Sequence, residues 1–178
     1  MTVEDLLRVP GKAELIRGRI VTFAASGHRP NIVAGRIFRS LAGYCDTPGR
    51  GFAFTDSMGF AIPELTSGRE SFSPDASFYS GLPPANLMKF VSNPPDFAVE
   101  VRSENDYGPA AERDMAAKRA DYFEAGTRVV WDVDPEAGTL RKYTSTDPLL
   151  FATFAAGQVA DALPAAPGWS VSVDWILA

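Results

Sequence analysis

Two acidic residues, Asp75 and Glu100, lie in or beside predicted strands, where a buried carboxylate would need a partner. Asp75 directly follows Pro74, and Glu100 interrupts the apolar run Phe97–Val101. A buried carboxylate without a partner is unstable, so Glu100 must be hydrogen-bonded, ion-paired, bound to a metal or placed at a strand end. If Asp75 and Glu100 converge with the backbone carbonyl of Val101, their oxygens suit Mg²⁺, which binds few carboxylates and keeps several waters. Such a metal makes bound water a nucleophile, which predicts metal-assisted hydrolysis of a phosphodiester.

The same two acids also allow a purely structural interpretation. Asp75 can cap a turn after Pro74, and Glu100 can pair with Arg102 or with another basic residue. A single pair of acids is a weak motif, because structural ion pairs also place carboxylates in strands. The residues alone leave both interpretations open.

A lysine on a predicted helix is the third candidate. Asp114, Lys118 and Tyr122 recur at intervals of four residues, so they lie along one stripe of that helix. If the stripe faces a strand that carries Glu100, Lys118 could position the attacking water or neutralise charge in the transition state. The alternative is an exposed ion pair between Asp114 and Lys118, an ordinary arrangement on a solvated helix face.

Hydrophobic periodicity predicts the elements that must position these residues. A short helix starts at Thr2, a hairpin turns at Gly18, and longer helices cover Asn31–Tyr44 and Ala110–Ala125, the last ending at Gly126. The predicted strands are Ala13–Arg17, Arg19–Phe23, Phe52–Phe54, Met58–Ile62, Phe72–Tyr79, Phe97–Val101, Arg128–Val133 and Thr139–Tyr143, with short strands near Phe151–Phe154 and Ser170–Val173. The second long helix and its flanking strands form a crossover unit. The predicted fold class is α/β (α+β), a mixed central sheet flanked by helices.

Composition narrows the class of protein. The chain has 178 residues, of which 46% are hydrophobic and 22% charged, so residues 1–178 are expected to form a single globular domain. No apolar run approaches a membrane span, and the N-terminus is acidic where a secretory signal is basic. The single cysteine, Cys45, excludes an internal disulfide framework and a Cys-based zinc site. We therefore expect a soluble, cytoplasmic protein.

The charge balance bears on nucleic-acid binding. Lys and Arg number 17 against 22 Asp and Glu, a net charge of -5, so the field of the whole molecule repels a polyanion such as DNA. Any DNA contact must depend on a local cationic surface. The candidates are arginines on the two long predicted helices: Arg29, Arg36, Arg39, Arg113 and Arg119.

Five blocks of this sequence resemble the Uma-two family of restriction-endonuclease-like proteins, which belongs to the PD-(D/E)XK nuclease superfamily. The blocks are Glu14-Leu15-Ile16 with Gly18 and Ile20-Val21, then Pro74-Asp75, then Asp96 to Ser103, then Asp114, Lys118, Tyr122 and Gly126, and finally Val130 to Pro135. The resemblance runs from about residue 12 to 145. The order and spacing of the blocks are more specific than any one of them.

The resemblance implies a restriction-endonuclease-like fold and a role for each matching residue. Asp75 and Glu100 are similar to the acids that bind Mg²⁺ or Mn²⁺. The superfamily lysine normally follows the second acid by two residues, where this chain has Arg102, and Lys118 matches a lysine that the family carries on the following helix. Arg102 is then expected to contact the phosphate side of a substrate. Glu14 matches an early acid that can complete the metal shell in related nucleases.

These observations lead to one main hypothesis and two alternatives. The main hypothesis is a Mg²⁺-dependent endonuclease that hydrolyses DNA, with weak or partner-assisted binding because the chain is acidic. One alternative is a catalytically inactive nuclease-like fold that serves as a homodimeric binding or regulatory module. The other is a nuclease domain that depends on a separate targeting protein. Glu104, which stands where the family usually has proline, adds negative charge near the expected phosphate path and is compatible with a changed or lost activity.

Overall fold

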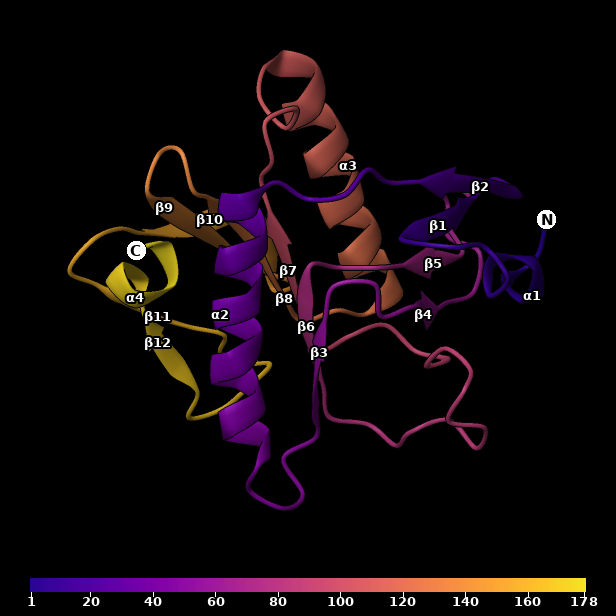
Figure 1. The fold of residues 1–178 in the computed structure, drawn as a ribbon, viewed down its shortest axis with the longest axis horizontal. Coiled ribbons are helices and arrows are strands. Elements are labelled where there is room, and N and C mark those ends of the chain that lie inside the picture. Colours follow the sequence, from indigo (N-terminus) through magenta and orange to yellow (C-terminus); the bar gives the residue numbers. More distant parts are fainter.

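A six-stranded mixed sheet lies at the centre of the computed structural model, which describes residues 1–178 (Figure 1). In spatial order its strands are β10 (Asp147–Phe154), β9 (Thr139–Thr144), β8 (Val129–Asp134), β7 (Phe97–Val101), β6 (Ala76–Tyr79) and β3 (Phe52–Thr55). Only β7 and β8 run parallel, and α3 (Pro109–Ala125) connects them. The predicted crossover unit and the predicted fold class are both confirmed.

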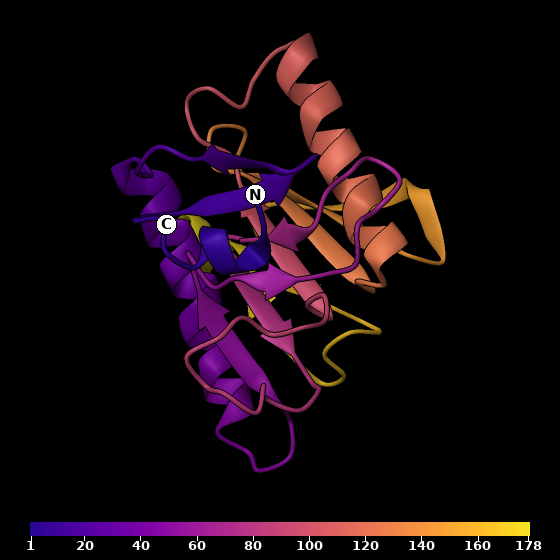
Figure 2. The ribbon, with the colours of Figure 1, turned by 90° about the vertical axis from the view of Figure 1, so that its right-hand side faces the viewer.

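Strand alternation makes the two faces of this sheet chemically different. Odd-numbered residues of β7 and β8, among them Val99 and Trp131, join the apolar core with α2 (His28–Cys45). Even-numbered residues, among them Glu100 and Asp132, lie on the face that α3 covers. From the side, the strands lie between the two long helices (Figure 2). Glu100 therefore breaks an apolar run in the sequence without entering the apolar core.

The C-terminal segment completes the apolar face. It consists of β11 (Val159–Asp161), β12 (Ser170–Ser172) and α4 (Val173–Leu177), the last of which lies beside α2. Trp169 packs against Trp131, with ring centroids 5.3 Å apart. The sequence predicted only a strand at Ser170–Val173, but the strand ends at Ser172, whose hydroxyl accepts the Trp175 N–H and so caps a helix.

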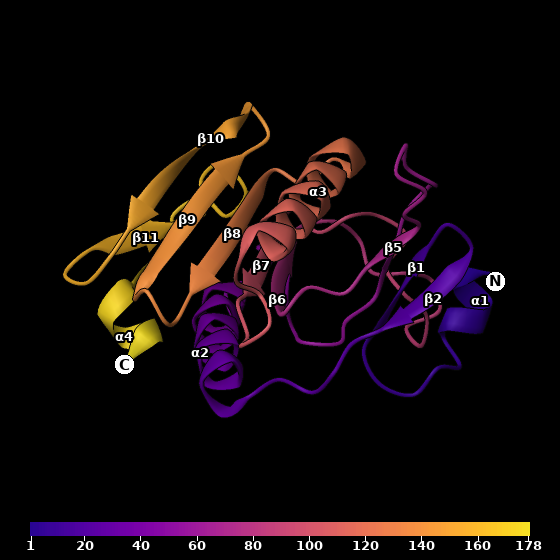
Figure 3. The ribbon, with the colours of Figure 1, turned by 90° about the horizontal axis from the view of Figure 1, so that it is seen from above.

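The N-terminal segment lies at the opposite end of the molecule from β9 and β10 (Figure 3). It comprises α1 (Val3–Leu6), β1 (Ala13–Ile16) and β2 (Arg19–Thr22). The predicted hairpin is confirmed: Ile16 pairs with Arg19, and the two turn residues Arg17 and Gly18 have φ of 52° and 66°. Positive φ at both positions is the geometry of a tight hairpin turn, which glycine adopts without strain.

The predicted strand Phe72–Tyr79 divides into two strands that belong to different sheets. β5 (Ser71–Phe72) pairs with β4 (Phe60–Ala61), whereas β6 begins at Ala76 and joins the central sheet. Pro74 lies between them and has no N–H to donate to a ladder. The break leaves Asp75 at the entrance to β6 instead of within a continuous strand.

Charged groups hold α3 against the sheet together with a small apolar cluster, in which Tyr122 joins Ala98 and Val130 of the sheet. The only buried residues of α3 are Asp121 and Tyr122. Ion pairs connect α3 to the neighbouring elements: Glu112 with Arg102, Lys118 with Glu100 and Glu14, and Asp121 with Arg69.

Neither α3 nor any other helix has the length and hydropathy needed to cross a membrane.

Arg69 ties the N-terminal hairpin to α3, which predicts a large effect of its removal. The guanidinium contacts buried Glu14 of β1 and lies 2.8 Å, Nε to Oδ2, from Asp121. Replacing Arg69→Met leaves two buried carboxylates undercompensated and should lower the free energy of unfolding by about 3–5 kcal/mol. Urea denaturation measures this loss.

The matched control is Arg8→Met, because the Arg8 side chain is 77% exposed and pairs only with Asp5. An exposed pair contributes less than about 1 kcal/mol, so this variant should unfold close to wild type. Equal stability of the two variants would contradict a structural role for Arg69.

Candidate active site

The register of β6 and β7 brings the two predicted acids together. Ala76 pairs with Val99 in this antiparallel ladder, so Asp75 stands opposite Glu100, on the face that α3 covers. The backbone secures the approach, because the Asp75 N–H donates to the Val99 carbonyl at 3.0 Å. Two residues far apart in the sequence thus become cross-strand neighbours.

Both oxygens of Asp75 have partners. Oδ2 accepts the Val101 N–H at 2.7 Å, and Oδ1 lies 2.5 Å from Nζ of Lys12. The same ammonium reaches Oδ1 of Asp56 at 2.8 Å. Asp75 is therefore held by the strand that carries Glu100 and by a lysine just before β1, and it does not merely cap a turn after Pro74.

Glu100 is held by two side chains of α3. Its Oε1 accepts the Tyr122 hydroxyl at 2.6 Å and lies 2.9 Å from Nζ of Lys118, while Oε2 has no protein partner. Burial raises the pKa of Glu100, and the negative charges of Asp75 and Glu14 add to that rise against the opposing effect of the lysines. The surroundings of Glu100 thus disfavour its ionised form, and additional positive charge nearby would favour that form.

Lys118 lies between two carboxylates and makes no ion pair with Asp114. Its Nζ is 2.9 Å from Glu100 and 3.1 Å from Glu14, and only 17% of its side chain is exposed. Burial would lower the pKa of Lys118, but these two carboxylates outweigh burial and raise it. The ammonium is therefore a fixed positive charge beside Glu100.

Glu14 has a different environment from the one that the resemblance implies. It is fully buried, with Oε2 on Arg69 and Oε1 on Lys118 and on the Ser73 N–H at 2.9 Å. Burial opposes ionisation, but Lys118 and Arg69 overcome it and lower the pKa of Glu14. Both carboxylate oxygens of Glu14 are therefore engaged, and a metal would have to compete with two cations for them. In this structure Glu14 anchors Lys118.

Arg102 is occupied by other contacts. Its Nε and Nη2 donate to the two oxygens of Asp132 at 2.8 and 2.7 Å, and Nη1 contacts Glu112. The side chain is buried and forms no ion pair with Glu100. This bidentate pair links β7, β8 and the start of α3, so a phosphate would have to compete with two carboxylates for Arg102.

Two residues near Asp75 were not singled out from the sequence. Lys12 stands two positions before Glu14, so strand alternation places both on one side of β1, and Asp56 directly follows β3. Tyr122 lies on the predicted helical stripe, and its spacing by itself indicates no role. Its ring stacks on Phe72 with centroids 4.0 Å apart, which fixes the hydroxyl at Glu100.

The donor set fits a divalent metal in chemistry and in charge. Asp75, Glu100 and the Val101 carbonyl are hard oxygen ligands, and Mg²⁺ takes one or two carboxylates with water completing its shell. The ionic cluster at this site contains five carboxylates and three cations, namely Glu14, Asp56, Asp75, Glu100 and Asp121 with Lys12, Arg69 and Lys118. With every group ionised the excess is two negative charges, which one divalent cation would balance.

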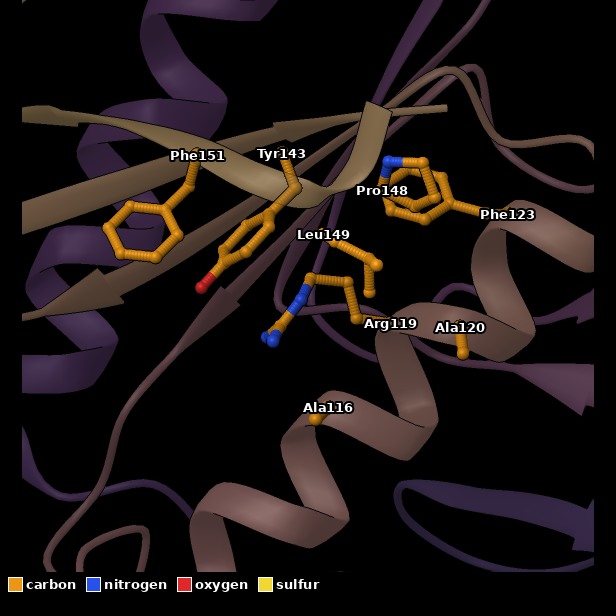
Figure 4. Close-up of a pocket in the computed structure, with 8 residues that line it drawn as sticks. All are labelled: Ala116, Arg119, Ala120, Phe123, Tyr143, Pro148, Leu149 and Phe151. Carbon is orange, nitrogen blue, oxygen red and sulfur yellow. The ribbon is translucent and has the colours of Figure 1, made fainter. Parts of the chain in front are cut away.

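A separate apolar pocket lies between α3 and the β9–β10 hairpin (Figure 4). Its volume is about 360 Å³, and its lining residues are Ala116, Arg119, Ala120, Phe123, Tyr143, Pro148, Leu149 and Phe151. The Arg119 guanidinium lies 3.8 Å from the Tyr143 ring centroid. Its lining contains no carboxylate and no histidine, and so it differs in chemistry from the ionic cluster around Glu100.

Comparison with known proteins identifies the family of this mixed α+β fold. A family model described as Uma2, putative restriction endonuclease, matches residues 3–174. The chain therefore belongs to the Uma2 family. A crystal structure described as a putative nuclease belonging to DUF820 from Anabaena variabilis ATCC 29413 has a similar fold, with a TM-score of 0.75 at 16% identity over 99% of this chain and 97% of that one. Comparison with curated proteins gives no match.

The raised pKa of Glu100 predicts a pH-dependent gain in stability for Glu100→Gln. Because the folded protein holds this proton more tightly than the unfolded chain, wild-type stability falls as pH rises from 4.5, the ordinary Glu value, through the raised pKa. The glutamine variant escapes this loss. In chelator it should be more stable than wild type at about pH 8 and nearly equal to it at acidic pH, as measured by thermal unfolding across a pH series.

Glu124→Gln provides a control of opposite sign. Hydrogen bonds from Thr66 lower the pKa of Glu124, so its charged form is the favoured one and the variant should not gain stability at high pH. A Glu100→Gln variant that is less stable than wild type at high pH would contradict the disfavoured charge of Glu100.

Proposed function

We propose that this chain is a divalent-metal-dependent nuclease that hydrolyses phosphodiester bonds of DNA. The observation that carries the proposal is the convergence of Asp75 and Glu100 on adjacent strands with the Lys118 ammonium 2.9 Å from Glu100. Two carboxylates can hold a divalent metal, and a lysine can stabilise the negative charge that develops on a phosphate during hydrolysis. Membership of the Uma2 family and the nuclease-like fold give further support.

Asp75, Glu100 and the carbonyl of Val101 would hold Mg²⁺ or Mn²⁺. When bound, the metal would lower the pKa of its water and stabilise charge on the phosphate. The Val101 N–H orients the Asp75 carboxylate, and the Tyr122 hydroxyl orients that of Glu100. The chain thus positions both carboxylates before a ligand arrives, which reduces the cost of organising the site.

Lys118 would act on the substrate side of the same site. Its ammonium can donate to the attacking water and offset negative charge that develops on the phosphate. Glu14, held by Arg69 and the Ser73 N–H, keeps Lys118 charged and in place. Because the chain carries a net charge of -5, we expect its binding to DNA to be weak, sensitive to salt or assisted by a partner.

A second candidate function is a catalytically inactive nuclease-like fold that acts as a homodimeric binding module. The favouring observation is the edge strand β10, on which Leu149 and Leu150 are 88% and 66% exposed. An unpaired apolar edge is a template for pairing with another chain.

Cleavage assays with matched variants separate the two candidates. Single-stranded, duplex and branched DNA and RNA are incubated with Mg²⁺ or Mn²⁺. Asp75→Asn and Glu100→Gln should each lower cleavage by at least about 100-fold, because each removes a proposed metal ligand, and Lys118→Met should lower it by about 100- to 1000-fold, because it removes the cation beside the reacting phosphate.

The control for the lysine variant is Lys142→Met, which removes the same charge from a residue paired with Asp161 outside the cluster. It should cleave like wild type. Cleavage that persists in Asp75→Asn and Glu100→Gln would rule out this site, and a folded wild type that neither binds metal nor cleaves any substrate would favour the inactive module.

A further inference from the structure

Lys12 occupies a position that a bound cation would compete for. Its Nζ bridges Oδ1 of Asp75 at 2.5 Å and Oδ1 of Asp56 at 2.8 Å, and only 14% of the side chain is exposed. The Phe23 ring lies nearby, with its centroid 6.0 Å from Nζ. The ammonium is thus enclosed by two carboxylates from different segments, the end of β3 and the start of β6.

The division of contacts on Asp75 makes this competition direct. Oδ2 is engaged by the backbone N–H of Val101, so Oδ1 is the oxygen on which a metal would depend most. That oxygen is the one that Lys12 contacts. Positive charges on one oxygen repel each other, so a divalent cation at Oδ1 and the Lys12 ammonium disfavour each other.

Lys12 and Lys118 differ in how freely they can leave the acids. Lys118 pairs with Glu100 but is also held by Glu14, which is fully buried. Lys12 has a second partner, Asp56, whose side chain is 32% exposed, and a flexible four-carbon stem. Lys12 can therefore release Asp75 while it stays paired with Asp56.

We propose that Lys12 is a built-in counter-ion that neutralises Asp75 in the metal-free protein and moves off it, onto Asp56 alone, when a divalent cation binds. This inference rests on the proposed function, because it assumes that Asp75 is a metal ligand. Lys12 then stabilises the metal-free fold and weakens metal binding by one and the same interaction. Asp56 favours metal binding by retaining the displaced ammonium, without itself being a ligand.

The test is Mn²⁺ binding, followed by electron paramagnetic resonance of the free ion, on the full chain without nucleic acid. Lys12→Met should bind Mn²⁺ at least about 10-fold more tightly than wild type, because no cation then competes for Asp75. Its melting temperature in chelator should fall, and Mn²⁺ should raise it by more than in wild type. Lys89→Met is the matched control, since Lys89 pairs with Glu4 away from the cluster, and it should bind Mn²⁺ like wild type.

Two further variants keep the test decisive if Lys12→Met folds poorly. Lys12→Arg keeps a positive charge beside Asp75 and should bind Mn²⁺ no more tightly than wild type. Asp56→Asn removes the second partner of Lys12 and should weaken Mn²⁺ binding, whereas Lys12→Met with Asp56→Asn should bind as tightly as Lys12→Met alone.

The outcomes distinguish failure of the inference from failure of the proposed function. If wild type binds Mn²⁺ and Lys12→Met binds it no more tightly, or Lys12→Arg binds it as tightly as Lys12→Met, only the counter-ion role is overturned. A double variant that binds more weakly than Lys12→Met would make Asp56 a ligand and overturn its assigned role. If neither wild type nor any Lys12 variant binds Mn²⁺, the proposed metal site itself fails.

Discussion

The partly buried charge of Glu100 constrains much of the structure around it. Burial disfavours this carboxylate, and Lys118 and Tyr122 must therefore approach it from α3. A buried lysine is itself costly without a further anion, which fully buried Glu14 provides from the N-terminal hairpin. One acid on β7 is thus connected to a helix and a hairpin through successive charge pairs, because each buried charge needs a partner of opposite sign.

This constraint accounts for the unusual contact between α3 and the sheet. A helix on a sheet normally buries an apolar stripe, as α2 does with Val33, Ile37 and Leu41. α3 instead buries only Asp121 and Tyr122, and it reaches the sheet through ion pairs as well as through the apolar cluster around Tyr122. Ion pairs often stabilise a fold less than packed apolar side chains of the same size do. The contact between α3 and the sheet therefore contributes less stability than an apolar contact would, but it fixes the positions of the charges.

Whether a residue of the site could be predicted from the sequence depends on how far along the chain its partners lie. Local patterns made Glu100 and Lys118 candidates, because an acid inside an apolar run and a four-residue helical spacing can be read from the sequence, and the family resemblance then favoured roles for Asp75, Glu100 and Lys118. Lys12 and Arg69 could not, since their partners lie 63, 55 and 52 positions away. Glu14 matched a family block, but only its contacts with Arg69 and Lys118 revealed an anchoring position.

The sequence by itself determined the types of most elements, the parallel crossover between β7 and β8, and the pair of acids that the site is built on. Periodicity carries this information because it reflects which side of each element is buried. Only the tertiary structure decided that Pro74 divides a strand, that Arg102 pairs with Asp132, and which cations neutralise which acids. Electrostatic pairing depends on distances between distant segments, and those distances exist only once the chain has folded.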